Sequence, residues 1–351
     1  MRKHTLADFA LVVFSILLPI ILVAPCSAEI TITPKEKWTN VFAGEKITRH
    51  FMIQSTEQFN GRVLWTFAAT NGRIFPRGRG ERILKIPAGQ AIEVKVPLEM
   101  PSLKAGVVLP TEFELSVVKQ GQGKPETTRK SKWRIFFADP FTDRTKWLKD
   151  LQITVYDPTR DVNTVKLLEK FKIPHEEIRN PAALNEVKEG LILIGENVSF
   201  FDERGLDEIL TGLAKRGLPV ICLAPKEGQF VLPDTEANPT PPNKLSWRKQ
   251  DIISELDKRL DAEAWANTPE VTATSLRIKV DDGRAIAEVS NKSNGWSWFE
   301  VDYPNHGKVL VLGFPIVGQW ENSPTPRYLL AHLLEYVTNA SKPNTERKKG
   351  S

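Results

Sequence analysis

A change in the hydrophobic period near residue 139 constrains the fold of this chain more than any other feature. Before it, apolar side chains recur at every second position, which is the pattern of strands with one buried face. Beyond the break at residues 139–143, short apolar runs alternate with stretches of helical period, the order in which βα units build a parallel sheet. We therefore expect two domains, residues 29–138 and 151–338, joined by a linker over residues 139–150.

The first domain is expected to be an immunoglobulin-like β-sandwich of about seven antiparallel strands. Val63, Trp65 and Phe67 share one face of a strand, and similar alternation covers residues 92–98, 113–117 and 133–137. Turn signals that contain glycine separate these runs, as hairpin connections require. The signals are Asn60-Gly61, Asn71-Gly72, Ala88-Gly89 and Gly121-Gln122-Gly123.

The second domain is expected to hold a mainly parallel sheet with helices on both sides. The clearest helix runs from Leu206 and is stopped by Gly217 and Pro219. The other expected helices are 162–171, 249–260 and 327–337, and the expected strands are 151–156, 175–179, 190–195, 219–224, 296–301 and 308–314. Asp282-Gly283 predicts a hairpin between 276–280 and 285–289, and the proline-rich stretch 232–242 predicts an irregular insertion.

The first 28 residues have the pattern of an export signal. Arg2 and Lys3 form a basic head, residues 9–28 carry no charge, and small residues precede a cut after Ala28. This predicts a periplasmic or secreted mature protein. The uncharged run is also long enough to cross a bilayer, so an uncleaved membrane anchor remains an alternative. A lipidated Cys26 is a weaker alternative because Pro25 stands where a small residue is required.

Charge and cysteine content exclude several classes of protein. The formal net charge of +5 is spread along the chain without a basic stripe, so nucleic acid is not an expected partner. Cleavage after Ala28 would leave Cys222 as the sole cysteine, which excludes an internal disulfide. The segment 339–351 is polar and basic and is expected to be a disordered tail.

Three stretches of the second half resemble the class I glutamine amidotransferase-like superfamily, in the branch with trehalose-utilisation proteins and β-galactosidase small domains. They are Gly190-Leu191-Ile192-Leu193-Ile194-Gly195, Arg216-Gly217-Leu218-Pro219-Val220-Ile221-Cys222 and His306-Gly307-Lys308-Val309-Leu310-Val311-Leu312-Gly313. The helix-like segment Pro324-Thr325-Pro326-Arg327-Tyr328-Leu329-Leu330-Ala331-His332-Leu333-Leu334 also looks like that branch's closing helix. The resemblance covers about residues 151–337 and implies a flavodoxin-like, amidotransferase-like α/β domain.

The residues that catalysis would require in that superfamily are missing here. Catalytic members carry a cysteine on a glycine-flanked strand-to-helix elbow and a His-x-Glu pair after a late strand. Cys222 has only Val220, Ile221, Leu223 and Ala224 around it, and residues 313–317 contain neither histidine nor glutamate. A thiol without a base stays protonated at neutral pH. We therefore expect Cys222 to be a core residue and the domain to be non-catalytic.

Any ligand is expected at the carboxyl ends of the parallel strands, where open α/β sheets bind their ligands. The candidate ligand-binding residues at these ends are Asp157, Arg160, Glu196, Asn197, Lys226, Glu227 and Trp320. Their mixture of charge, amide and indole suits a sugar or a peptide. Asp157-Pro158-Thr159 is alternatively a turn that leads into a helix cap, and the other candidates are alternatively solvated loop residues.

No metal or cofactor is expected. His50, His175, His306 and His332 are far apart in sequence and form no ligand motif, and the chain has no phosphate-binding glycine loop. Nine tryptophans are a separate signal, because indole faces stack on sugar rings. Trp65 and Trp133 are expected in the core. Trp296 and Trp298 share one face of a possible strand, and exposure is expected for Trp247 and Trp320, which lie near breaks in the pattern.

The function predicted from sequence is that of an exported, non-catalytic binding or scaffolding protein of the cell envelope. Its expected partner is a carbohydrate or an envelope protein, and a membrane only if the signal segment is retained. One alternative is a carbohydrate-active hydrolase or isomerase that uses Asp157, Glu196 or Glu227 as acid and base. Another is a purely structural protein whose sandwich mediates assembly.

Overall fold

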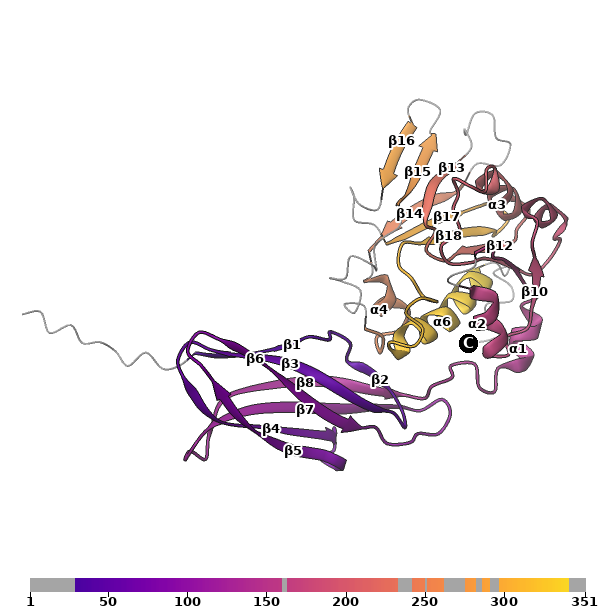
Figure 1. Cartoon of the computed structure of the whole chain (residues 1–351). Coiled ribbons are helices and arrows are strands. Elements are labelled where there is room, and N and C mark those ends of the chain that lie inside the picture. Colours follow the sequence, from indigo (N-terminus) through magenta and orange to yellow (C-terminus); the bar gives the residue numbers. More distant parts are fainter. Residues whose placement is uncertain are drawn as a thin grey trace, which may run out of the picture.

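The computed structural model describes residues 29–159, 163–232, 242–249, 251–261, 275–281, 286–290 and 297–340. A β-sandwich comes first and a larger unit of mixed sheet and helices follows it (Figure 1). The strands of the sandwich are β1 (Ile30–Pro34), β2 (Asn40–Phe42), β3 (Lys46–Ser55), β4 (Phe59–Ala69), β5 (Ile74–Ile86), β6 (Ala91–Glu99), β7 (Val108–Lys119) and β8 (Pro125–Phe136).

The sandwich consists of a three-stranded sheet, ordered β1-β3-β6, and a five-stranded sheet, ordered β2-β8-β7-β4-β5. Inward side chains of both sheets form one core, in which Phe51 of β3 stacks on Phe113 of β7 at 5.4 Å between ring centroids. The predicted face of Val63, Trp65 and Phe67 is buried in this core. The prediction of a sandwich is therefore confirmed, but its two sheets contain eight described strands instead of about seven, and β2 pairs with β8 in parallel fashion.

The predicted turn at Asn60-Gly61 is wrong, because both residues lie inside β4. Gly61 is needed there for close packing, since a Cβ would lie 2.2 Å from the Val118 carbonyl oxygen. By contrast, Gly72, Gly89 and Gly121 have positive φ angles at the predicted turns.

The second unit alternates strands and helices as the sequence predicts. Its strands are β9 (Ile153–Tyr156), β10 (His175–Ile178), β11 (Leu191–Ile194), β12 (Pro219–Cys222), β13 (Glu227–Leu232), β14 (Lys244–Arg248), β15 (Ser275–Asp281), β16 (Ile286–Ser290), β17 (Trp298–Asp302) and β18 (Lys308–Leu312). Its helices are α1 (Thr145–Asp150), α2 (Thr164–Lys170), the 3₁₀ helix η1 (Pro181–Glu186), α3 (Leu206–Lys215), α4 (Ile252–Leu256) and α6 (Pro324–Ala340).

The main sheet has seven strands in the order β10-β9-β11-β12-β18-β17-β14. Pairing is parallel from β10 to β18, and β17 and β14 then add to β18 in antiparallel fashion. Apolar side chains of α1, α2 and α6 cover one face of this sheet, and those of η1, α3 and β13 cover the other. The main sheet is therefore mixed, with a parallel part from β10 to β18, and helices pack on both of its faces.

Additional strands lie where the sequence was least regular. β13 pairs with β15, which forms the predicted hairpin with β16. β14 and β13 were not predicted, since their short half-buried runs flank the proline-rich stretch. The helix expected over 249–260 is limited to α4. Residues 233–241 of the predicted insertion, the signal segment 1–28 and the tail from 341 lie outside the described residues.

The expected linker, residues 139–150, is packed structure rather than a free connection. It contains α1, and Phe141 and Leu148 are both buried in the core of the second unit. None of the helices in the described ranges is long and apolar enough to cross a membrane.

Polar contacts clamp the two units together. The carboxylate of Asp261 accepts hydrogen bonds from the backbone N–H groups of Thr39 and Asn40, both at 2.7 Å, and from the Thr39 hydroxyl at 2.7 Å. The guanidinium of Arg327 on α6 lies 4.1 Å from the ring centroid of Phe42 and donates to the Ala138 carbonyl at 3.0 Å. Figure 1 shows α6 at this junction, next to the end of β2.

Candidate functional site

The loops after β9, β11 and β12 meet at the carboxyl edge of the main sheet. The Gly195 N–H donates to the Tyr156 carbonyl, and the Asn197 N–H donates to the Ala224 carbonyl at 3.1 Å. A Cβ at position 195 would lie 2.4 Å from Cγ of Asp157, so only glycine allows this approach. The structure thus brings Asp157, Glu196 and Asn197 together, as the sequence predicts.

Asp157 is buried and bonded within its own loop. One carboxylate oxygen accepts from the Thr159 N–H at 3.0 Å and from its hydroxyl, and the other accepts from the Thr164 N–H at 2.6 Å. Thr164 is the first residue of α2, whose N-cap Asn163 accepts from the Lys166 N–H. Asp157 therefore has the turn-and-cap role that was the alternative interpretation of this motif.

Glu196 is buried at the carboxyl edge of the sheet and is hydrogen-bonded to another loop of that edge. Its side chain is 1% exposed, and its oxygens accept three backbone hydrogen bonds, from Ile316 and Val317 at 2.6 Å and from Gly318 at 2.9 Å. Burial raises the pKa of Glu196, and the negative charge of Asp157 adds to this, while the three N–H donors oppose it. The carboxylate ties β11 to the loop after β18 and does not point into solvent.

The remaining candidates do not form one constellation. Asn197 is exposed and has a left-handed φ of 67°. Lys226 is exposed, and its Nζ lies 3.5 Å from the partly exposed carboxylate of Glu227. Arg160 lies outside the described residues. Of these side chains, Glu227 lines a shallow pocket beside Phe201 and Arg204, and the exposure of Asn197 and Lys226 is that of solvated loop residues.

The expected exposure of Trp320 is wrong, because its side chain is 2% exposed. It packs edge-on against Phe171 at 5.1 Å between ring centroids, and its carbonyl accepts from Nε of Arg327. Trp298 is also buried, since it belongs to β17, and its indole donates to Glu300 at 3.0 Å. Trp247 is half-buried and packs against Phe299 at 4.3 Å, and Trp296 lies outside the described residues.

Cys222 is the last residue of β12 and is fully buried. Burial strongly raises the pKa of its thiol, so the thiol is protonated at neutral pH. The strained position comes two residues later, at Ala224, with a φ of 31°. A sharp turn after this strand therefore exists, but the residue on it carries no nucleophile.

No group of three or more histidine, cysteine, aspartate or glutamate side chains that could hold a metal occurs among the described residues. Two of the histidines are instead paired with carboxylates. His332 on α6 lies 3.0 Å from Asp257, and His50 on β3 pairs with Glu36. Hydrogen bonds to Asp257 and Glu335 raise the pKa of His332 to about 9.

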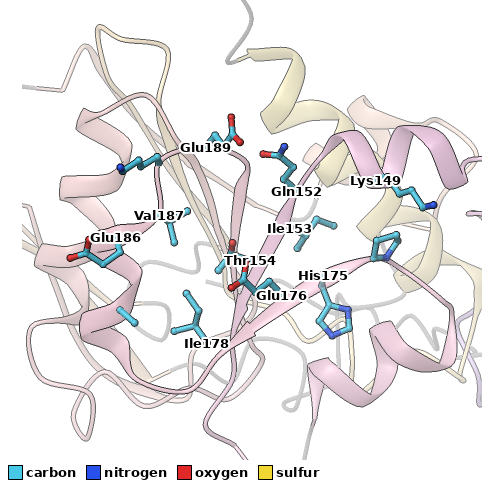
Figure 2. Close-up of a pocket in the computed structure, with 13 residues that line it drawn as sticks. Lys149, Gln152, Ile153, Thr154, His175, Glu176, Ile178, Glu186, Val187 and Glu189 are labelled. Atoms are coloured by element: carbon cyan, nitrogen blue, oxygen red, sulfur yellow. The ribbon is translucent and has the colours of Figure 1, made fainter.

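A hollow of about 720 Å³ lies on the opposite edge of the sheet, near the amino ends of β9, β10 and β11. The 3₁₀ helix η1 contributes Ala183 and Glu186 to the wall of this hollow. Its exposed charged residues are Lys149, Glu176, Glu186, Lys188 and Glu189. Lys149 and Glu186 lie on opposite sides of it (Figure 2). None of the predicted site residues lines it.

A second cavity, of about 440 Å³, lies in the sandwich between β3, β8 and the segment that connects β1 to β2. None of the predicted ligand-binding residues lines this cavity, although the sequence contains one signal for it. The signal was Arg49, which shares the inward face of β3 with Phe51 and Ile53. An arginine in phase with core residues requires a polar partner in the interior, and its position could have been noticed from the sequence alone.

Comparisons with known proteins do not assign a family. No family model matches the chain, and no curated protein matches it. Solved structures that match include the CARDB domain of a Pyrococcus furiosus protein, at 7% identity and a TM-score of 0.22 over 31% of this chain and 93% of that one. A β-glucosidase from Listeria innocua matches at 8% identity and a TM-score of 0.23, over 31% of this chain and 16% of that one. Likeness at this level carries no argument about fold or function.

Proposed function

We propose that the chain is an exported, non-catalytic binding or scaffolding protein of the cell envelope. Its second domain would be a flavodoxin-like, amidotransferase-like domain, and its sandwich an immunoglobulin-like domain. The strand order supports the first assignment, since β9 to β12 and β18, numbered as they follow in the chain, stand in the order 2-1-3-4-5 of flavodoxin-like sheets. The export signal in residues 1–28 supports the location.

The observation that carries the proposal is the state of the carboxylates at the strand ends. Acid–base catalysis on a glycoside needs two carboxyl groups that face each other across a space large enough for the substrate. Instead, Asp157 accepts a hydrogen bond from the first backbone N–H of α2, and Glu196 accepts hydrogen bonds from the backbone N–H groups of residues 316–318. A substrate could reach them only if these loops opened.

The amidotransferase reaction is disfavoured for a separate reason. A nucleophile must be accessible and close to a base. Cys222 has no exposed surface, and the position with strained backbone is occupied by Ala224. The resemblance to that superfamily thus supports a shared fold and not a shared activity.

A purely structural role for the sandwich receives less support. Among its described residues, the large apolar side chains that are exposed are Ile83 and Val107. The two side chains lie at opposite ends of β7. Ile83 is level with Val118 near the end of β7, because both residues are register partners of Arg62 on β4. Val107 comes directly before the start of β7. At about 3.4 Å per residue they lie tens of ångströms apart, so they do not form the flat apolar patch that assembly requires.

The test measures turnover and binding on the same sample. Mature protein from residue 29 is incubated with glutamine and with a panel of 4-nitrophenyl glycosides, and is screened on a glycan array and on purified murein sacculi. We expect saturable binding on the array or on the sacculi, and no turnover above a buffer blank. Turnover that disappears in Cys222→Ala, Glu196→Gln or Glu227→Gln, but persists in the control Glu57→Gln at an exposed position of the sandwich, would overturn the proposal.

A further inference from the structure

The cavity in the sandwich lies at a seam that the strands leave open. β2 pairs with β8 only from Arg134 to Phe136, so the preceding part of β8 has no strand on that side. The segment 35–39 spans this opening and leads into β2. Its last residue, Thr39, donates hydrogen bonds from its backbone N–H and its hydroxyl to Asp261 of the second unit. The seam cavity, as we name it, is lined by Thr33, Pro34, Glu36, Lys37, Trp38, Thr39, Arg49, Phe51, Arg129, Ser131 and Trp133.

Arg49 is an incompletely paired cation in this cavity. Its residue is 7% exposed, its guanidinium lies 4.6 Å from the Trp133 ring centroid, and one terminal nitrogen donates to the Trp38 carbonyl. Its Nε is buried and has no hydrogen-bond partner among the residues that the structure describes. Burying an unpaired donor on a charged group is costly, and a carboxylate is the acceptor that matches a guanidinium best.

The charges of the lining favour an anion. Arg49 and Arg129 line it together with Glu36, and the negative charges of Glu36 and Asp261 both act on Arg49. The carboxylate of Glu36 is already used, since it accepts from the His50 N–H at 3.0 Å and pairs with the His50 ring. Arg129 donates to the Ile32 carbonyl at 3.2 Å and has no carboxylate partner in the described part of the chain. The guanidinium of Arg129 is therefore the group in the described lining that an anion can pair with.

The other walls fit a hydroxylated ring. Trp38 and Phe51 supply aromatic surface, and Thr33 and Ser131 supply hydroxyl groups at the rim. The volume of about 440 Å³ lies within the range of small-molecule pockets. We propose that the seam cavity binds a sugar that carries a carboxylate, with Arg49 and Arg129 holding the acid group. This rests on the proposed function, because it identifies the ligand class of a binding protein.

The test uses full-length mature protein and matched pairs of sugars. Saturation-transfer NMR and titration calorimetry are run with galacturonate and glucuronate, and with their neutral counterparts galactose and glucose. At least one acidic sugar should bind saturably, and its neutral counterpart should bind about 10- to 100-fold more weakly, since a hydrogen bond to a charged group is lost. Arg129→Gln should lower the affinity for the acidic sugar by a similar factor.

Controls separate a lost site from a lost fold. Arg82→Gln changes an exposed arginine of β5 that does not line the cavity, and should leave the affinity unchanged. Arg49→Gln should abolish binding, and its urea midpoint shows whether it folds. If Arg49→Gln does not fold, the exposed Arg129 provides the decisive variant.

The inference is overturned if none of the acidic sugars binds, if the neutral sugars bind equally well, or if Arg129→Gln binds like Arg82→Gln. Binding of sacculi or glycans without turnover in that case would leave the proposed function standing. Conversely, turnover of a bound acidic sugar would overturn the proposed function and keep the site.

Discussion

Replacing Glu196 by alanine tests the structural role of this carboxylate at the carboxyl edge of the main sheet. The carboxylate accepts hydrogen bonds from three consecutive backbone N–H groups, those of Ile316, Val317 and Gly318. These donors belong to a loop that follows β18, whereas Glu196 follows β11. Alanine would leave all three donors without their acceptor and would open a void at the carboxyl edge of the sheet.

The expected loss follows from the number of donors and their burial. A buried donor without a partner costs about 1–3 kcal/mol, and water that enters would recover part of this for the two bonds that are only partly buried. The free energy of unfolding should therefore fall by about 3–5 kcal/mol. For a domain of this size, the loss corresponds to a decrease in Tm of about 10 °C.

Differential scanning calorimetry and urea denaturation measure this change. Glu227→Ala is the matched control, because Glu227 is partly exposed and makes a surface ion pair with Lys226. The control should change the free energy of unfolding by less than about 1 kcal/mol. A Glu196→Ala protein as stable as the control would refute the reasoning, and would return Glu196 to the list of candidate catalytic groups.

Further predictions concern His332 on α6, the contact of Asp261 with the sandwich, and the thiol of Cys222. Folding raises the pKa of His332 from about 6.5 to about 9, so its protonated form adds at most about 3 kcal/mol to the free energy of unfolding. This stabilisation is complete below pH 6.5 and is lost as pH rises through 9. Urea titrations should show this loss in wild type and not in His332→Gln. Asp261→Ala removes the three hydrogen bonds that it accepts from the sandwich, and should separate the melting of the two units in calorimetry, which a single transition would contradict. Cys222 should react with a disulfide reagent only in denaturant, and rapid labelling of native protein would show that it is accessible.

Periodicity predicted much of the fold because burial dictates it locally. The apolar runs around Ile192, Val220 and Val309 became the buried strands of the main sheet, and the stripe of Leu206 and Leu210 became the buried face of α3. The strands β13 and β14 were missed because they are short, half-buried and flank a proline-rich stretch.

The site was less predictable because its bonds are long-range. Because Asp157 and Glu196 each follow a parallel strand, the sequence predicted that they lie close together. The backbone N–H groups that donate to Glu196, however, lie about 120 residues further along the chain. Trp320 lies next to a break in the pattern, yet the ring of Phe171 and the guanidinium of Arg327 bury it. Such partners depend on tertiary packing, which no local pattern contains.

Recovery of a bound glycan tests the central claim most directly. The mature protein is incubated to equilibrium with the glycan that it retains best on the array, and mass spectrometry compares the glycan before and after. Binding without catalysis predicts that the glycan is recovered intact at every protein concentration. Products that increase with protein concentration and with time would contradict the account.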